Sequence, residues 1–149
     1  MKKLTLLLIV LSTSLTYSQI KQVENVSEGI LIGKIAPMGN THIVCKKYGD
    51  TYSFIYADVN YQHIDEFKDF SFKDIDGAFD NLYNLIMTNL EAKSKDEVTL
   101  ELPDGILILK FEANMGIASF QFQFTNNNTI SGRSIYMTKR QAQKLFGKK

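Results

Sequence analysis

Few residues in this chain are of the types that carry out acid–base, nucleophilic or metal chemistry. The sequence has two histidines, His42 and His63, and a single cysteine, Cys45. His63 is followed closely by Asp65 and Glu66. An imidazole beside two carboxylates could serve general acid–base catalysis or supply metal ligands. These three residues are therefore the candidate site of a hydrolase. The alternative is an exposed polar loop, and no bound metal or cofactor is expected.

The other catalytic constellations fail on spacing. His42 and Cys45 are three positions apart on an expected strand, so their side chains point to opposite faces and do not form a catalytic pair. A Gly-x-Ser-x-Gly motif for a serine nucleophile is absent from the sequence. Asp74 and Asp76 begin a stretch that looks like a calcium loop. Its glycine falls at position four and Leu85 at position twelve, which does not fit an EF-hand. The sequence therefore favours a protein that is not an enzyme.

Four tyrosines suggest a site built for contact. Tyr48, Tyr52 and Tyr56 lie in or beside an expected hairpin, and Tyr61 follows it. Aromatic side chains on an open sheet face suit contact with proteins or glycans, because they combine a large apolar area with a polar hydroxyl. We expect some of these four tyrosines to lie exposed on the sheet face away from the helix, with core packing as the alternative for each, and the protein to be a non-enzymatic protein- or glycan-binding module. The alternatives are the hydrolase above and a structural envelope protein that associates with itself.

The start of the chain, residues 1–18, has the organisation of a secretory signal peptide. Two lysines give a positive start, an apolar run covers residues 4–15, and small polar residues lead to Ser18. The apolar run is about a dozen residues, whereas a membrane-spanning helix needs about twenty. We expect cleavage before Gln19 and export to the periplasm or the extracellular space. Residues 19–149 should then form a single domain without a membrane span.

The charge of the chain is nearly balanced but unevenly distributed. Removing residues 1–18 takes away two lysines and no acid, leaving 15 basic and 16 acidic residues and a net charge of −1. A nucleic-acid-binding domain needs a clearly basic face, so no nucleic-acid partner is expected. Residues 58–80 are rich in acids, whereas residues 139–149 contain five basic residues and no acid. Either these charges only complement helix dipoles, or the basic C-terminal helix docks on the acidic segment, within one chain or between two copies.

Two helices are predicted. The longer one runs from residue 72 or 75 to residue 92, where apolar residues recur at helical spacing. Its start is predicted either by a capping box of Ser71 and Asp74 or by Asp74 alone. The shorter helix begins at Thr138, where Gln141 completes a second capping box, and ends at Gly147.

Strands account for most of the remaining chain, and turn signals such as Gly-Asp and Pro-Asp-Gly separate them. We interpret residues 60–69 as a loop or an irregular edge segment. The element order is βββ-α-ββββ-α, so that each half is a run of strands ending in a capped helix. This order predicts an α+β fold: a curved antiparallel sheet of about six to seven strands, with the long amphipathic helix packed on it and a short C-terminal helix. The predicted strands cover residues 29–36, 41–47, 51–58, 97–102, 106–112, 117–125 and 129–137.

Overall fold

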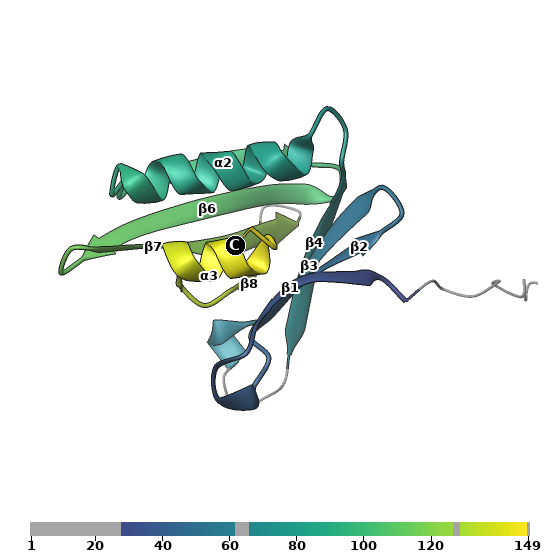
Figure 1. The fold of residues 1–149 in the computed structure, drawn as a ribbon, viewed down its shortest axis with the longest axis horizontal. Coiled ribbons are helices and arrows are strands. Elements are labelled where there is room, and N and C mark those ends of the chain that lie inside the picture. Colours follow the sequence, from purple (N-terminus) through teal and green to yellow (C-terminus); the bar gives the residue numbers. More distant parts are fainter. Residues whose placement is uncertain (1–27, 62–65, 127–128, 149) are drawn as a thin grey trace, which may run out of the picture.

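The computed structural model describes residues 28–61, 66–126 and 129–148 of the chain (Figure 1). The predicted signal peptide, residues 1–18, lies outside these ranges. The described residues form an α+β fold, as the sequence predicted. The elements are β1 (Ile30–Ile35), η1 (Pro37–Gly39), β2 (Ile43–Tyr48), β3 (Thr51–Ala57), η2 (Val59–Tyr61), β4 (Phe67–Lys73), α2 (Ala78–Glu91), β5 (Glu97–Leu102), β6 (Gly105–Asn114), β7 (Ile117–Asn126), β8 (Thr129–Arg133), β9 (Met137–Thr138) and α3 (Lys139–Leu145).

The strands form two antiparallel sheets, where the sequence predicted one curved sheet. The first sheet has the order β1-β2-β3-β4. The second has the order β5-β6-β7-β8, and the short strand β9 also pairs with β7. Figure 1 shows the strands of the first sheet running across those of the second, with α2 lying along β6. Because α2 contacts both β6 and β7, the predicted packing of the long helix on a sheet is confirmed.

Residues 67–69, which the sequence predicted as part of a loop or an irregular edge segment, begin the strand β4 at the edge of the first sheet. Phe70 and Phe72 alternate with polar residues along this strand, and both are buried in the core. Along the opposite face, Asp69 is exposed. Only every second residue is apolar, which is the pattern of a half-buried strand. The loop interpretation was wrong for residues 67–69 because Phe-Lys-Asp shows no alternation by itself, whereas the alternative of an edge segment agrees with the place of β4 at the end of the first sheet.

The start of α2 also differs from the prediction. The helix begins at Ala78, after Gly77 in the left-handed conformation at φ 73°. Ser71 belongs to β4, so the capping box with Asp74 does not form. The alternative was nearer the structure, because Asp74 Oδ1 accepts a hydrogen bond from the backbone N–H of Phe79 at 3.0 Å. Asp74 thus satisfies one of the free N–H groups of the first helical turn.

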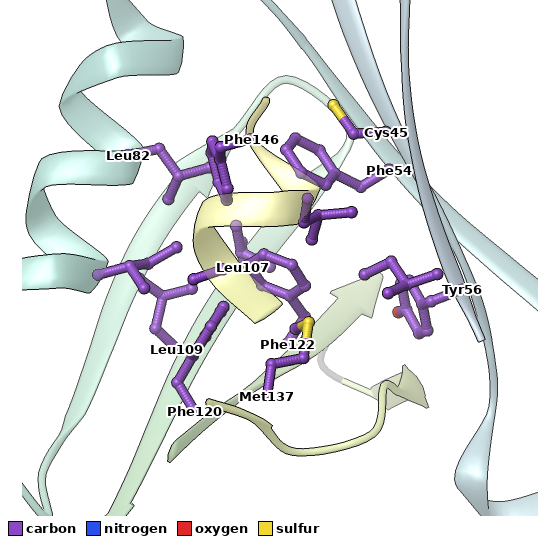
Figure 2. Close-up of a cluster of buried hydrophobic side chains, with 14 of the residues drawn as sticks. Cys45, Phe54, Tyr56, Leu82, Leu107, Leu109, Phe120, Phe122, Met137 and Phe146 are labelled. Atoms are coloured by element: carbon purple, nitrogen blue, oxygen red, sulfur yellow. The ribbon is translucent and has the colours of Figure 1, made fainter. Parts of the chain in front are cut away.

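The core is rich in aromatic side chains contributed by both sheets, by α2 and by Phe146 directly after α3 (Figure 2). Phe54 of the first sheet lies 5.5 Å from Phe122 of the second, ring centroid to centroid, in an edge-on arrangement. Phe146, directly after α3, lies 5.3 Å from Phe54 and 5.0 Å from Phe79 of α2. Such pairs are favourable because the positive edge of one ring meets the negative face of another. The residue Phe54 therefore joins the two sheets and α3 in one apolar cluster.

The segment that the sequence predicted as one strand over residues 129–137 is two strands, β8 and β9, separated by an irregular turn. Ser134 sits in this turn and replaces the missing ladder bonds. Its N–H donates to the carbonyl oxygen of Phe122 at 2.9 Å, and its Oγ accepts from the N–H of Phe122 at 3.0 Å. The side chain of Gln121 donates to the Ser134 carbonyl oxygen at 2.7 Å. Gln121 and Gln123 are therefore buried, although they lie on the polar face of β7.

The helix α3 begins and ends as predicted. Thr138 and Gln141 form the capping box, with the Thr138 N–H donating to Gln141 Oε1 at 2.9 Å. The helix ends at Leu145, and Gly147 follows in the left-handed conformation at φ 66°. Glycine adopts this conformation without the steric penalty that a Cβ atom would bring.

Charged residues at both ends of α3 bind α2 of the same chain. Lys148 Nζ lies 2.8 Å from Asp80 Oδ1 near the start of α2, and Lys139 Nζ lies 2.8 Å from Glu91 Oε1 at its end. Asp80 belongs to the acidic segment that the sequence singled out. Lys148 of the basic segment thus pairs with Asp80 of the acidic segment within one chain, whereas Glu91 lies outside that segment. These pairs are exposed and contribute little free energy, so the buried side chains of α3 fix its position.

Candidate functional site

The hydrolase candidate is only partly described by the structure. His63 and Asp65 lie outside the described residues. Glu66 is described, and its Oε1 forms an ion pair with Lys68 Nζ at 2.5 Å. This hydrogen bond raises the pKa of the Lys68 ammonium above its ordinary value. Glu66 is therefore paired with a cation of the adjoining strand β4.

Asp58 lies behind this ion pair and is 3% exposed. Its Oδ1 accepts hydrogen bonds from the backbone N–H and side-chain amide of Asn60 and from the backbone N–H of Arg133, at 3.0, 2.9 and 3.2 Å. Its Oδ2 is buried and has no hydrogen-bond partner among the described residues. Since Asp58 follows β3 and Arg133 ends β8, this carboxylate joins the two sheets. The sequence did not distinguish Asp58 from the other acids, because its partner is remote in the chain.

Cys45 is a core residue, as the sequence predicted. It is fully buried in β2 and faces Phe54 (Figure 2). Burial raises the pKa of the Cys45 thiol to about 12. The thiol is the weaker nucleophile, and at neutral pH it is the form present. Among residues 28–61, 66–126 and 129–148, no three His, Cys, Asp or Glu side chains come together as a metal site.

The four tyrosines do not share one surface. Tyr61 is 48% exposed, and Tyr48 is half-buried on the face of the first sheet that points away from the core. Tyr52 and Tyr56 are buried, so for these two residues the alternative of core packing holds. Tyr52, Phe54 and Tyr56 occupy every second position of β3. All three face the core, because alternate residues of a strand share a face. Tyr52 stacks on Phe79 of α2 with ring centroids 3.9 Å apart.

Tyr56 is held deeper in the core. Its hydroxyl donates a hydrogen bond to the carbonyl oxygen of Gly132 at 3.3 Å. Burial, followed by the nearby charges of Asp58 and Asp69, raises the pKa of the Tyr56 phenol above its ordinary value. A buried tyrosine whose hydroxyl finds a backbone acceptor is a structural residue. Tyr56 therefore joins β3 to β8 and is not accessible for contact with a partner.

An apolar groove of about 480 Å³ lies between α2, the end of β4 and the hairpin that joins β5 to β6. Leu82 and Leu85 of α2 form one wall, and Leu100 and Leu102 of β5 form another. Ile75, between β4 and α2, is 66% exposed at the mouth. The full lining is Phe72, Lys73, Ile75, Ala78, Asn81, Leu82, Leu85, Leu100, Glu101, Leu102, Pro103 and Leu107.

The groove exists because α2 does not cover the whole inner face of the second sheet. The helix packs over β6 and β7. The inward residues of β5, Val98, Leu100 and Leu102, are consequently only half-buried. Ile75, which the sequence placed in the apolar stripe of the long helix, lies before the helix and stays exposed. The sequence shows the apolar stripe of α2 and the alternation of β5, but it does not show where the helix crosses the sheet.

Charged and polar groups are few in the lining of this groove. Of its twelve lining residues, Lys73, Asn81 and Glu101 are polar or charged. One ammonium, one amide and one carboxylate on three different elements give no acid–base pair with a nucleophile. The groove is therefore suited to holding an apolar group, and its rim can orient a polar part of the same ligand.

Comparison of the chain with protein-family models, with curated proteins and with solved structures finds no match in any of the three. Neither helix among the described residues is long and apolar enough to cross a membrane.

Proposed function

We propose that this protein is exported and works as a non-enzymatic protein-binding module, with the groove between α2 and the β5–β6 hairpin as its contact site. The observation that carries the proposal is the groove itself. Its volume of about 480 Å³ lies within the range of roughly 300–1,000 Å³ of ligand sites, which are mostly apolar with a few polar groups. The proposal of export rests on the charged, apolar and small-residue order of residues 1–18.

The lining favours a protein partner over a glycan. Glycans are held by many hydrogen-bonding groups, whereas nine of the twelve lining residues are apolar. Of the four tyrosines that could have stacked on sugar rings, Tyr52 and Tyr56 are buried. Apolar side chains of a partner protein would replace water in the groove, and burial of such surface is the main driving force of association.

The test uses two isoleucines with matched exposure. Ile75 at the groove mouth is 66% exposed and Ile30 in β1, outside the groove, is 68% exposed. The purified protein is titrated with an anilinonaphthalene sulfonate dye and is also used to select peptides from a random phage-displayed library. We expect saturable dye binding at one site, selected peptides rich in apolar residues, and competition between the two.

The expected effect of Ile75→Asp is a loss of affinity for dye and peptides of about tenfold, because a charged group at the mouth of the groove must be desolvated on binding. Ile30→Asp should leave both affinities within about twofold. Equal effects of the two variants, or the absence of any saturable binding, would show that the groove is not the contact site. Circular dichroism of both variants checks that they are folded.

A further inference from the structure

The strand β5 is the end strand of the second sheet, and it lies directly beside the groove. Its register with β6 pairs Glu97 with Lys110 and Leu100 with Leu107. No strand among the described residues pairs with its other side. The end of a sheet presents unpaired backbone N–H and C=O groups and can accept a further strand.

The register also shows which backbone groups are free. The N–H of Phe111 donates to the carbonyl oxygen of Asp96 at 3.1 Å, which makes this a hydrogen-bonded pair just before β5. In an antiparallel ladder, hydrogen-bonded pairs occur at every second residue. Val98, Leu100 and Leu102 therefore bond to β6. The N–H and C=O groups of Glu97, Thr99 and Glu101 point to the open edge.

The two faces of β5 have different chemistry. Val98, Leu100 and Leu102 face inward and are half-buried, and the latter two line the groove. Glu97, Thr99 and Glu101 face outward and are exposed. The inward face of β5 is therefore apolar and its outward face acidic, with Glu101 also at the groove. Asp96 and Asp104 at the two ends of the strand are also exposed, and so is Lys95, a base directly beside Asp96.

We propose that the partner contributes an extended segment that adds to the second sheet beside β5, with apolar and basic residues in alternation. This inference rests on the proposed function of the groove. The apolar side chains of the added strand enter the groove next to Leu85 and Leu100. Its basic side chains lie on the solvent face beside Glu97 and Glu101, because opposite charges on neighbouring strands attract. The free backbone groups at Thr99 bond to the added strand.

The same acidic residues argue against a second copy of this chain as the occupant. If β5 of one copy paired with β5 of another, glutamates would face glutamates across the new ladder. Like charges on neighbouring strands are destabilising, and charged edges are a common protection against pairing of identical chains. The occupant is therefore a different, basic segment.

The test uses synthetic peptides of ten residues that carry a fluorophore. One alternates valine with lysine, a second alternates valine with glutamate, and a third repeats the valine–lysine sequence with N-methyl groups on its four central residues. N-methylation removes the backbone donors and keeps the side chains. We expect the valine–lysine peptide to bind in a fluorescence anisotropy titration, more weakly as salt is raised. The other two should bind at least about tenfold more weakly.

Variants at Thr99 test the backbone contact from the side of the protein. Thr99→Pro removes the outward N–H, which proline tolerates at a sheet edge, and Thr99→Ala keeps it. We expect Thr99→Pro to weaken binding of the valine–lysine peptide about tenfold and Thr99→Ala to change it less than about threefold. Binding should also slow hydrogen exchange at the amide of Thr99 in the wild-type protein. If Thr99→Pro is unfolded by circular dichroism, the N-methylated peptide and the exchange rate of Thr99 decide the question.

The outcomes separate this inference from the proposed function. If Ile75→Asp weakens dye and library-peptide binding while Thr99→Pro and N-methylation have no effect, the groove binds its partner without strand addition and the present inference is wrong. If Ile75→Asp has no effect on any ligand, both proposals are wrong. Equal binding of the lysine and glutamate peptides would refute the basic character of the partner. The Thr99 variants would then decide whether the partner adds a strand.

Discussion

The position of α3 against β1 can be tested with a single methyl group at Gly33. A Cβ atom at this position would lie 2.2 Å from the carbonyl oxygen of Lys144 and 2.3 Å from that of Leu145. Both atoms belong to the helix backbone, so no side-chain rotation relieves the clash. An ordinary contact begins at 3.4 Å. In Gly33→Ala the end of α3 must consequently move away from β1 by more than an ångström.

The cost follows from what such a movement separates. Ala142, Leu145 and Phe146 are buried, and Phe146 contacts rings of α2 and of the first sheet. A gap of about 1 Å removes a quarter to a half of the dispersion energy between such surfaces. Overpacking in a core costs about 1–3 kcal/mol. Because the clash is with backbone, we expect Gly33→Ala to lose about 3 kcal/mol.

Urea unfolding followed by circular dichroism measures this loss. With a denaturant slope of about 2 kcal/mol per molar urea, the midpoint should fall by about 1.5 M. Gly29→Ala is the matched control in the same part of the chain. Its Cβ atom would lie 2.6 Å from the ring of Tyr48, a half-buried side chain that can rotate. Its midpoint should change by less than about 0.3 M. A Gly33→Ala midpoint equal to that of Gly29→Ala would show that α3 does not rest on β1.

Three further outcomes follow from buried groups. The pKa of the Cys45 thiol is raised from 9.0 to about 12, so the folded protein should not react with a thiol reagent at about pH 8, whereas the urea-unfolded protein should. Because the thiol ionises at a lower pH in the unfolded chain than in the folded protein, the free energy of unfolding should fall between pH 9 and 12. Ser134→Ala leaves the N–H of Phe122 without its acceptor, and should cost about 1–3 kcal/mol in urea unfolding and speed hydrogen exchange at that amide. The pKa of the buried phenol of Tyr56 is raised, so Tyr56→Phe should not alter the ultraviolet titration of the folded protein at about pH 11.

Local patterns were sufficient for much of the fold. The capping box of Thr138 and the glycine after α3 determine the bounds of that helix by contacts within a few residues, so the sequence predicts them well. The same holds for the tight turn between β2 and β3. Two features depended on remote contacts and were missed. The strand β4 is defined by pairing with β3, and the interruption at Ser134 depends on its bonds to Phe122 across the sheet.

The candidate site was less predictable for the same reason. A tyrosine in an alternating strand has the same local pattern whether it faces solvent or core. Tyr52 and Tyr56 share the inward face of β3 with Phe54, and that spacing was the available signal that they are buried. The groove depends on the lateral position of α2 over the second sheet. Its residues come from four separate elements, and no spacing in the sequence relates Ile75 to Leu100.

The late position of Phe146 in the chain has a consequence for the order of folding. Phe146 packs against Phe54 of the first sheet and Phe79 of α2, so the shared core is complete only after residue 146 has been synthesised. Contacts between distant parts of a chain form slowly, because the loop between them must first close. A growing polypeptide that lacks the ring of Phe146 can form hairpins but cannot complete the shared core. Under the proposed export through a translocon, this delay would keep the chain open until residue 146 has been made.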